Sequence, residues 1–480
     1  MGAQPSAAAL AALKGVLGPG GWLDEPGDVA PFLDDFRGLY HGATALVARP
    51  ASVRAVVAVV EVCAAERIGI VPHGGNTSYC GGATPDESGT EIVLSLGRLK
   101  RVRDVDAAGC TLTVDAGCTL ASAQAAARNA LRRLPLSLGS EGSAQIGGTL
   151  STNAGGTAVL RYGMMRELVL GLEVVLPDGR VLDQLKSLRK DNTGYDVKQL
   201  FLGAEGTLGV ITGACLKLFA APGDYVTALA AVGGIGEAVA LLGRIRDAFG
   251  DAVEGFEYVP RIAHELALAE LPGIVTPFDH PHPAFALIEL AVPGAEPGVG
   301  ERFAQFLAAE TEAGAIRDAV IARSGPQRDA LWYLREHVPE AQSRAGASIK
   351  HDVSLPIGRL AEFVARAEQL LADLAPGARI IGYGHVGDGN LHFNLSPPAG
   401  VQRGSAAERE FLALAPGVNR AVHDLVGELG GSFSAEHGIG RLKVGELERY
   451  EDPVALDVMR RIKAALDPDG IMNPGKVLRR

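Results

Sequence analysis

Two histidines in the segment GHVGDGNLHFN, residues 384–394, stand at a spacing that could hold a metal ion. The dipeptide Asp388-Gly389 is typical of a two-residue hairpin turn, and a turn centred there would place His385 opposite His392. Directly opposed residues have β-carbons roughly 5 Å apart, which lets two imidazoles converge on one ion. A register shift of one residue would separate the rings, and the segment could also hold two ordinary strand histidines.

A third ligand could come from SAEHGIG, residues 434–440, where Glu436 stands beside His437. Adjacent side chains diverge, so a metal-binding Glu436 would leave His437 on the substrate side, where an imidazole can take a proton near neutral pH. Two histidines, one carboxylate and an open position are typical of a catalytic metal site. On this segment alone, Glu436 could equally be a carboxylate near the start of a helix.

Three further polar groups could hold an acidic substrate. Arg335 lies in WYLREH, which predicts a helix, and Lys350 lies in SIKHD, which predicts a strand. Asn394 would share the strand face of His392. Arginine grips a carboxylate through two parallel hydrogen bonds, whereas lysine supplies a point charge, but both cations are also ordinary on a solvated surface.

Two glycine-dense loops in the first half of the chain could bind phosphate through their backbone. HGGN, residues 73–76, follows a predicted strand, and SEGSAQIGGTLSTNAGG spans residues 140–156. Successive N–H groups in such loops form anion-binding nests without lysine or arginine. Neither loop has the G-x-G-x-x-G pattern of a Rossmann dinucleotide site, and each taken singly could be structural.

The elements that must position these groups alternate along the chain as in α+β domains. Before Pro222 the pattern predicts a helix at 53–65, a hairpin turn at 177–179, and strands at 68–72, 91–96, 111–114, 171–176 and 208–218. After Pro222 it predicts helices at 236–249, 300–313, 328–344, 357–374 and 405–429, with strands at 284–290, 347–355 and 379–384. A length of 480 residues favours two or three domains.

The composition narrows the class of protein. A formal charge of -11 without a run of Lys and Arg argues against nucleic-acid binding. The five cysteines are scattered and include no C-x-x-C pair, which argues against a disulfide framework and favours a reducing, cytoplasmic location. No uncharged apolar run approaches the roughly 18 residues of a membrane helix, and the N-terminus lacks the pattern of a signal peptide.

Several longer motifs resemble the FAD-linked oxidase family of the vanillyl-alcohol oxidase type, and within it the dehydrogenases of D-2-hydroxyglutarate and D-lactate. These motifs are HGGNTSYCGG, IGGTLSTNAGG, SLRKDNTGYDVKQLFLGAEGTLGVIT, GHVGDGNLHFN, SAEHGIG and DPDGIMNPGK, and the match covers nearly the whole chain. The resemblance implies an α+β fold with a two-subdomain FAD-binding domain over residues 1–221. It further implies an α/β substrate and metal domain with an antiparallel sheet over residues 222–430, and a helical C-terminal segment, 431–480, that returns to the FAD domain.

The resemblance also implies roles for single residues. FAD would be non-covalent, since Asn76 stands where covalently flavinylated relatives carry histidine. The implied metal ligands are His385, His392 and Glu436, with zinc favoured over manganese or cobalt. The implied proton acceptor is His437, and the implied substrate-binding residues are Arg335, Lys350 and Asn394. The residues expected to bind FAD are Pro72, Gly74, Gly75, Asn76, Thr77, Ser78, Ser140, Gly142, Ser143, Gly147, Gly148, Thr152, Asn153, Gly156, Glu205, Gly209, Ile211 and Asn473.

The implied reaction is oxidation of a small D-2-hydroxy acid, with D-2-hydroxyglutarate the expected substrate, to its 2-keto acid. Hydride would pass to the flavin, and the electrons then to electron-transfer flavoprotein or a quinone. Two departures bear on this expectation: His73 stands where relatives often carry arginine, and Pro339 where the hydroxyglutarate enzymes carry a substrate-binding hydroxyl. A D-lactate or glycolate dehydrogenase, a metal-dependent hydrolase and a non-catalytic ligand-binding protein stay as alternatives, and a homodimer stays open.

Overall fold

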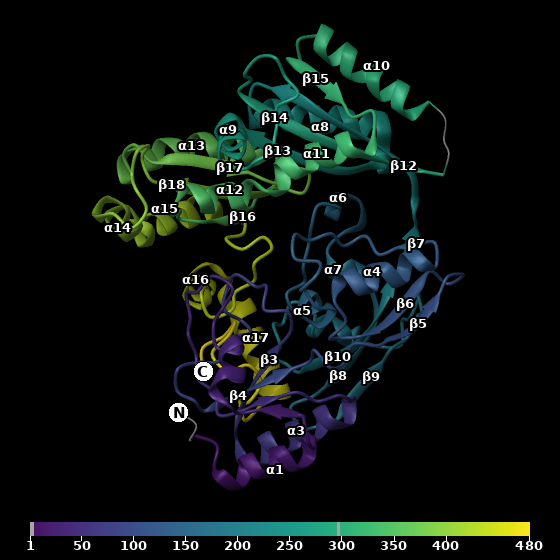
Figure 1. Cartoon of the computed structure of the whole chain (residues 1–480), viewed down its shortest axis with the longest axis vertical. Helices are drawn as coiled ribbons and strands as arrows, with labels where there is room; N and C mark the ends of the chain where they lie inside the picture. The colour runs from purple at the N-terminus through teal and green to yellow at the C-terminus, as the bar shows by residue number, and fades with distance from the viewer. Residues whose placement is uncertain (1–3, 295–297) are drawn as a thin grey trace. The chain divides into compact units, whose positions relative to one another are not determined.

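The computed structural model describes residues 4–294 and 298–480 and divides into two compact units (Figure 1). The first unit contains residues 1–156, 162–221 and 436–480, and the second contains residues 157–161 and 222–435. The chain therefore leaves the first unit at Pro222 and returns to it at Glu436. Within the described ranges, no helix has the length and apolar character needed to cross a membrane.

The first unit is built on two main sheets. The four-stranded sheet has the order β1 (Trp22–Leu23), β2 (Val47–Ala48), β4 (Glu91–Ser95), β3 (Gly69–His73). The five-stranded antiparallel sheet has the order β5 (Val102–Asp106), β6 (Thr111–Asp115), β10 (Val210–Lys217), β8 (Val169–Val175), β9 (Val181–Gln184), and a separate pair joins β7 (Arg132–Arg133) to β11 (Phe219–Ala220). Its helices are α1 (Ala7–Leu17), α2 (Pro26–Val29), α3 (Val53–Glu66), α4 (Leu120–Asn129), α5 (Ile146–Ser151), α7 (Met165–Leu168), α16 (Val444–Tyr450) and α17 (Pro453–Leu466), and α6 (Val159–Tyr162) spans the unit boundary.

Helix α3 precedes β3 and the first glycine loop in the chain. The Ser52 side chain accepts a hydrogen bond from the Ala55 N–H and caps the helix. Val56, Val59, Val60 and Cys63 recur at helical spacing and are fully buried. The chain then turns and enters β3, which pairs in parallel with β4 along its whole length. The predicted helix at 53–65 and the strands on either side of the loop are therefore confirmed.

The second unit carries a four-stranded and a three-stranded sheet. The larger has the antiparallel order β13 (Val253–Pro260), β14 (Ala284–Pro293), β12 (Pro222–Val232), β15 (Asp318–Ile321). The smaller has the antiparallel order β16 (Asp352–Ser354), β18 (Asn390–Ser396), β17 (Arg379–Tyr383). The helices are α8 (Ile235–Phe249), α9 (Arg261–Glu270), α10 (Val299–Glu312), α11 (Gly325–Glu336), α12 (Val338–Ala345), α13 (Leu360–Leu374), α14 (Ala406–Ala413) and α15 (Ala415–Glu428).

Three predicted elements of this unit were too long. The helix predicted at 328–344 divides into α11 and α12 at His337, because Pro339 in the first turn of α12 has no N–H to continue the ladder of hydrogen bonds. The helix predicted at 405–429 likewise divides into α14 and α15, because Pro416 lies in the first turn of α15. The strand predicted at 347–355 is reduced to β16 and an isolated bridge at Ile349, so Lys350 lies just before a strand rather than within one.

The C-terminal tail is fastened to the four-stranded sheet by a buried ion pair. Lys476 Nζ lies 3.2 Å from Glu91 Oε2, and the two residues are 2% and 0% exposed. Burial lowers the pKa of Lys476, while the charge of Glu91 opposes this change. The tail also pairs with β3 through a bridge between Ile70 and Met472. The residues that follow α17 are thereby held beside the first glycine loop.

We expect Lys476→Met to lower the free energy of unfolding by about 3 kcal/mol, because it leaves the Glu91 carboxylate buried with less compensation. Arg479→Met is the matched control, since Arg479 is exposed and pairs with Glu448, and its loss should cost under about 1 kcal/mol. Urea unfolding followed by tryptophan fluorescence measures both variants. Equal losses of stability in the two variants would contradict this account of the tail.

Candidate functional site

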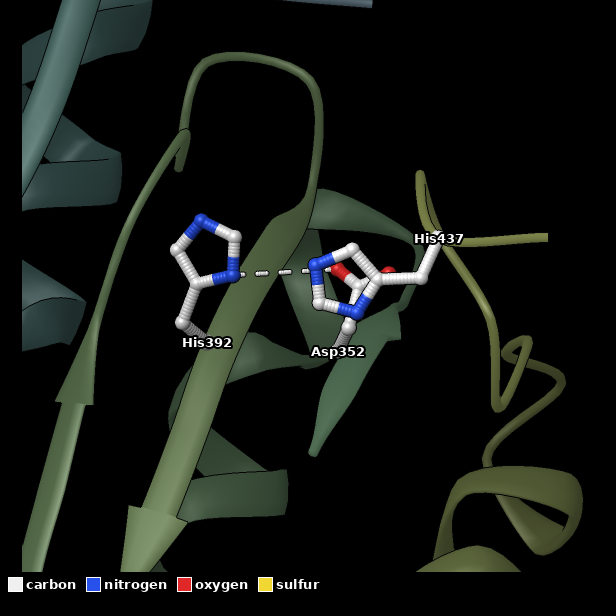
Figure 2. Close-up of side chains that lie close together, drawn as sticks. All are labelled: Asp352, His392 and His437. Atoms are coloured by element: carbon white, nitrogen blue, oxygen red, sulfur yellow. Dashed lines mark ion pairs between the residues drawn. The ribbon is translucent and has the colours of Figure 1, made fainter. Parts of the chain in front are cut away.

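One face of the three-stranded sheet is centred on His392. Across β16 and β18, His392 lies opposite Asp352, and across β17 and β18 it lies opposite Tyr383. The His392 Nδ1 atom is 3.8 Å from Asp352 Oδ1, an ion-pair contact that Figure 2 marks with a dashed line. Asp352 is 1% exposed and Tyr383 is 2% exposed, so this row of side chains is largely shielded from water.

The two substrate-binding residues predicted near this row share its face. Asn394 follows His392 by two positions on β18, and alternation keeps both side chains on one side. The β16 register, continued through the bridge of Ile349 to Leu395, places Lys350 opposite Asn394. The Asn394 amide is held in place, since its Nδ2 donates to Gln342 Oε1 at 2.9 Å and its Oδ1 accepts from the His351 N–H.

The predicted two-residue turn between the two histidines is wrong. The observed register pairs Tyr383 with His392, and the Asn390 N–H donates to the His385 carbonyl at 3.1 Å, so residues 386–389 form a longer loop. The observed register differs from the expected one by two residues, and a shift of two preserves the face of each side chain. The imidazoles of His385 and His392 therefore still converge, with ring centroids 5.5 Å apart.

His385 has a buried carboxylate behind it that sequence reasoning missed. Its Nδ1 lies 2.6 Å from Glu257 Oε1, and Glu257 is 1% exposed. The backbones of Tyr258 and Gly384 pair as an isolated antiparallel bridge, which makes Glu257 and His385 direct neighbours across the two segments. The sequence analysis predicted no strand at 253–260, where β13 lies. A charged residue inside such a buried strand is the signal that could have pointed to Glu257.

Arg335 lies on α11, as predicted, and its guanidinium contacts the same carboxylate. Both Nε and Nη2 of Arg335 are 2.7 Å from Glu257 Oε2, and the guanidinium also packs on the Tyr383 ring. Burial alone would raise the pKa of Glu257, but the charges of Arg335 and His385 outweigh it and lower the pKa to about 2. A substrate carboxylate at Arg335 would therefore share the guanidinium with Glu257, whose negative charge the guanidinium already balances.

Glu436 and His437 directly follow the last residue of the second unit. The Ala435 N–H donates to the Asp352 carbonyl at 3.2 Å, so the covalent chain itself carries both residues to the end of β16. Among the described residues, the ligand atoms of His385, His392 and Glu436 lie within 4.8 Å of one another, and those of Asp352, His392 and His437 meet the same limit (Figure 2). No helix begins at Glu436, since α16 starts at Val444, so its alternative placement near a helix start is wrong.

The loop that carries His437 is fixed inside the first unit. The Glu205 carboxylate accepts hydrogen bonds from the N–H groups of Ile439 and Gly440 at 2.7 and 2.8 Å. The Tyr79 ring stacks on the His437 imidazole, with centroids 4.5 Å apart. Burial raises the pKa of Glu205, although the two backbone donors oppose this rise. The carboxylate of Glu205 thus serves this loop, and its predicted contact with FAD stays a prediction.

The two glycine loops have features that fit a cofactor bound through backbone. A β-carbon on Gly75 would lie 2.1 Å from the Ser143 carbonyl oxygen, so the two loops approach too closely for any side chain there. The buried atoms Gln145 Oε1 and Asn473 Oδ1 have no hydrogen-bond partner among the described residues. Four residues expected to bind FAD are non-glycine residues with a positive φ, a strain that functional sites concentrate: Asn76, Asn153, Glu205 and Asn473.

The other residues expected to bind FAD are placed as follows. They lie in β3 and the loop after it (Pro72, Gly74, Thr77, Ser78), in or before α5 (Ser140, Gly142, Gly147, Gly148), after α5 (Thr152, Gly156), and at the start of β10 (Gly209, Ile211). Ile211 packs into the hydrophobic core of the first unit.

His73 is buried, and burial lowers its pKa to about 4, so it does not replace the positive charge of the arginine that relatives often carry.

Comparison with known proteins gives a consistent set of relatives. Residues 44–184 match the family described as "FAD binding domain", and residues 221–477 match "FAD linked oxidases, C-terminal domain". The chain is 38% identical over 471 residues to the mitochondrial D-2-hydroxyglutarate dehydrogenase of Bos taurus, covering 98% of this chain and 83% of the relative. It is 36% identical to the D-2-hydroxyglutarate dehydrogenase of Xanthomonas citri pv. viticola, covering 94% and 93%. A solved structure of p-cresol methylhydroxylase with bound substrate is 15% identical, with a TM-score of 0.73 and coverage of 98% and 96%.

We expect Gly75→Ala to lower the affinity for FAD about tenfold, because the new methyl group would force the two glycine loops apart. Gly139→Ala is the control, since a β-carbon at Gly139 would meet nothing within 4 Å. Flavin absorbance per purified protein, followed by fluorescence titration of the flavin-free form, measures both variants. Full flavin affinity in Gly75→Ala would show that these loops do not form the cofactor site.

Proposed function

Because the chain belongs to the FAD-linked oxidase family, we propose that it oxidises D-2-hydroxyglutarate to the 2-keto acid. The predicted family and the predicted α+β fold are both confirmed, and the protein is an FAD-dependent oxidoreductase. The observation that carries the choice of a hydroxy-acid substrate is the convergence of His385 and His392 on one strand face. Lys350 and Asn394 stand on this same face and offer a cation and an amide to a carboxylate.

We propose that His385, His392 and Glu436 hold a divalent ion. Two imidazoles and one carboxylate form the ligand set of a catalytic zinc site, and manganese or cobalt suits the same atoms. The ligand atoms lie within 4.8 Å of one another, a spread that one ion can bridge. When bound, the ion would polarise the substrate hydroxyl, and FAD would supply the ring that accepts the hydride.

His437 is the proposed proton acceptor for the substrate hydroxyl. An imidazole exchanges protons near neutral pH, and the stacking contact with Tyr79 fixes the plane of this ring. The two hydrogen bonds that the N–H groups of Ile439 and Gly440 donate to Glu205 limit the movement of the loop. A general base must be held within hydrogen-bond reach of the proton that it takes, and these contacts supply such rigidity.

The substrate carboxylates would be held by Lys350, Asn394 and Arg335. Lys350 and Asn394 lie opposite each other, so one carboxylate can contact both. Arg335 would orient the substrate rather than supply a full positive charge, since Glu257 shares its guanidinium. Pro339, in the first turn of α12, offers no side-chain donor, and this favours D-lactate or glycolate as a second candidate substrate.

The electron acceptor in our proposal is electron-transfer flavoprotein or a quinone. The chain lacks a nicotinamide fingerprint, so a soluble nicotinamide is disfavoured as the oxidant. The hydrolase alternative rests on two histidines and a glutamate activating water, a mechanism with no use for FAD. The two family matches, one of them to an FAD-binding domain, therefore give the dehydrogenase stronger support.

The proposal predicts that D-2-hydroxyglutarate bleaches the bound flavin under anaerobic conditions. Removal of the metal with a chelator should abolish bleaching while the flavin stays bound, and added zinc should restore it, because the substrate hydroxyl would otherwise keep its high pKa. Stopped-flow absorbance measures each step. Full-rate bleaching of the metal-free protein would contradict the metal assignment, and faster bleaching by D-lactate would favour the second candidate.

His437→Ala should leave FAD and metal bound but slow single-turnover flavin reduction by about 10²–10⁴-fold, the usual contribution of a general base. His264→Ala serves as the control, because His264 is a buried histidine that packs on Phe285. Rapid mixing with substrate and measurement of flavin absorbance give both rates. A near wild-type rate in His437→Ala would refute the role of His437.

A further inference from the structure

We propose that Glu257 is a positioning residue that orients His385 toward the metal ion. This inference rests on the proposed metal site and adds a residue that neither the motifs nor the comparisons assign. Glu257 lies on β13, in the larger sheet of the second unit, whereas both histidines belong to the smaller sheet or to the loop that adjoins it. The contact between the two sheets thus supplies the carboxylate that faces the back of one ligand.

The hydrogen bond between the two side chains fixes the tautomer of His385. An ionised carboxylate can only accept, so the Nδ1 atom, 2.6 Å from Glu257 Oε1, must carry the proton. The Nε2 atom then keeps its lone pair, the form in which a neutral imidazole binds a metal. Metal-binding histidines commonly have such a carboxylate partner, which also fixes the orientation of the ring. His392 turns its own Nδ1 atom toward Asp352, at 3.8 Å.

Two features hold Glu257 in the position that this role requires. The bridge between Tyr258 and Gly384 contains two backbone hydrogen bonds, of 2.9 and 3.1 Å. This bridge places Glu257 and His385 directly opposite each other. Arg335 occupies the second oxygen of the carboxylate through Nε and Nη2, each at 2.7 Å. The guanidinium balances the buried negative charge, and the first oxygen stays directed at His385.

The chain offers a matched control for Glu257. Glu289 lies on β14 of the same sheet, is 3% exposed, and accepts from Arg328 Nε and Nη2 at 2.7 Å each. Its other partners are the Thr227 hydroxyl and the Trp332 indole, so no histidine among the described residues hydrogen-bonds to this carboxylate. Substitution of either glutamate leaves its arginine with a weakened partner, Arg335 being buried and Arg328 partly exposed. Only the substitution at Glu257 replaces the anionic carboxylate that faces His385 Nδ1 with a neutral amide.

The test compares zinc binding by the flavin-loaded wild type, Glu257→Gln and Glu289→Gln. Each protein is stripped of metal and titrated with zinc against a chromophoric chelator, and flavin content and thermal unfolding report the folded state. We expect zinc affinity to fall about 10–100-fold in Glu257→Gln and to change less than about twofold in Glu289→Gln. The ligand-field absorption bands of the cobalt-loaded protein should shift only in Glu257→Gln, because that variant alone changes the electron donation of a ligand.

A second variant keeps the test decisive if Glu257→Gln does not fold. Glu257→Asp preserves the charge that balances Arg335 but withdraws the oxygen from His385, and it should show the same loss of zinc affinity. Zinc affinity equal to wild type in the folded variants overturns the role of Glu257 and leaves the proposed function intact. If the wild type itself binds no zinc, manganese or cobalt, the metal site and the inference that rests on it both fail.

Discussion

The alternation of side chains along β17 and β18 decides whether this protein has a candidate metal site. His392 points to the face that also carries Asp352, Tyr383 and Asn394, and the ring of His385, in the loop after β17, lies with its centroid 5.5 Å from that of the His392 ring. A slip of one residue would send one imidazole to the opposite face, where hydrophobic residues pack. Every other group of the site is placed relative to this pair of rings.

The first unit has its own fixed backbone. Glu205 and Asn473 both have left-handed backbone conformations, and both connect segments far apart in the sequence. The Asn473 side chain donates to the carbonyls of Gly82 and Glu205, while the Glu205 carboxylate accepts from Ile439 and Gly440. The glycine loop, the loop of His437 and the C-terminal tail are therefore tied together by hydrogen bonds of 2.7–2.9 Å.

Sequence patterns predicted the parts of the fold that depend on local physics. The helix at 53–65 follows from a serine cap and apolar residues at helical spacing, and the breaks at Pro339 and Pro416 could have been read from the missing N–H of proline. The prediction of a two-residue hairpin turn was wrong because Asp388-Gly389 allows more than one loop length. The pairing of β18 with β16 and β17 sets the register instead.

The residues that sequence reasoning missed act across long separations. Glu257 and His385 are 128 positions apart, and their contact depends on one backbone bridge between two sheets. No local pattern encodes such a pairing. Arg335 was expected to bind substrate and was placed on the correct helix, but its ion pair with Glu257 could be known only once β13 had been located. Glu205 also acts across a long separation, because its carboxylate accepts a hydrogen bond from a loop more than two hundred positions away.

In our proposal, His385 and His392 together hold a divalent ion through their Nε2 atoms. Anomalous diffraction from crystals of the protein as purified, recorded on both sides of the absorption edge of the bound metal, would locate this ion. We expect a single strong peak about 2.0–2.1 Å from both Nε2 atoms. Stoichiometric metal with its peak elsewhere, or a peak bonded to either Nδ1 atom, would refute binding through the two Nε2 atoms.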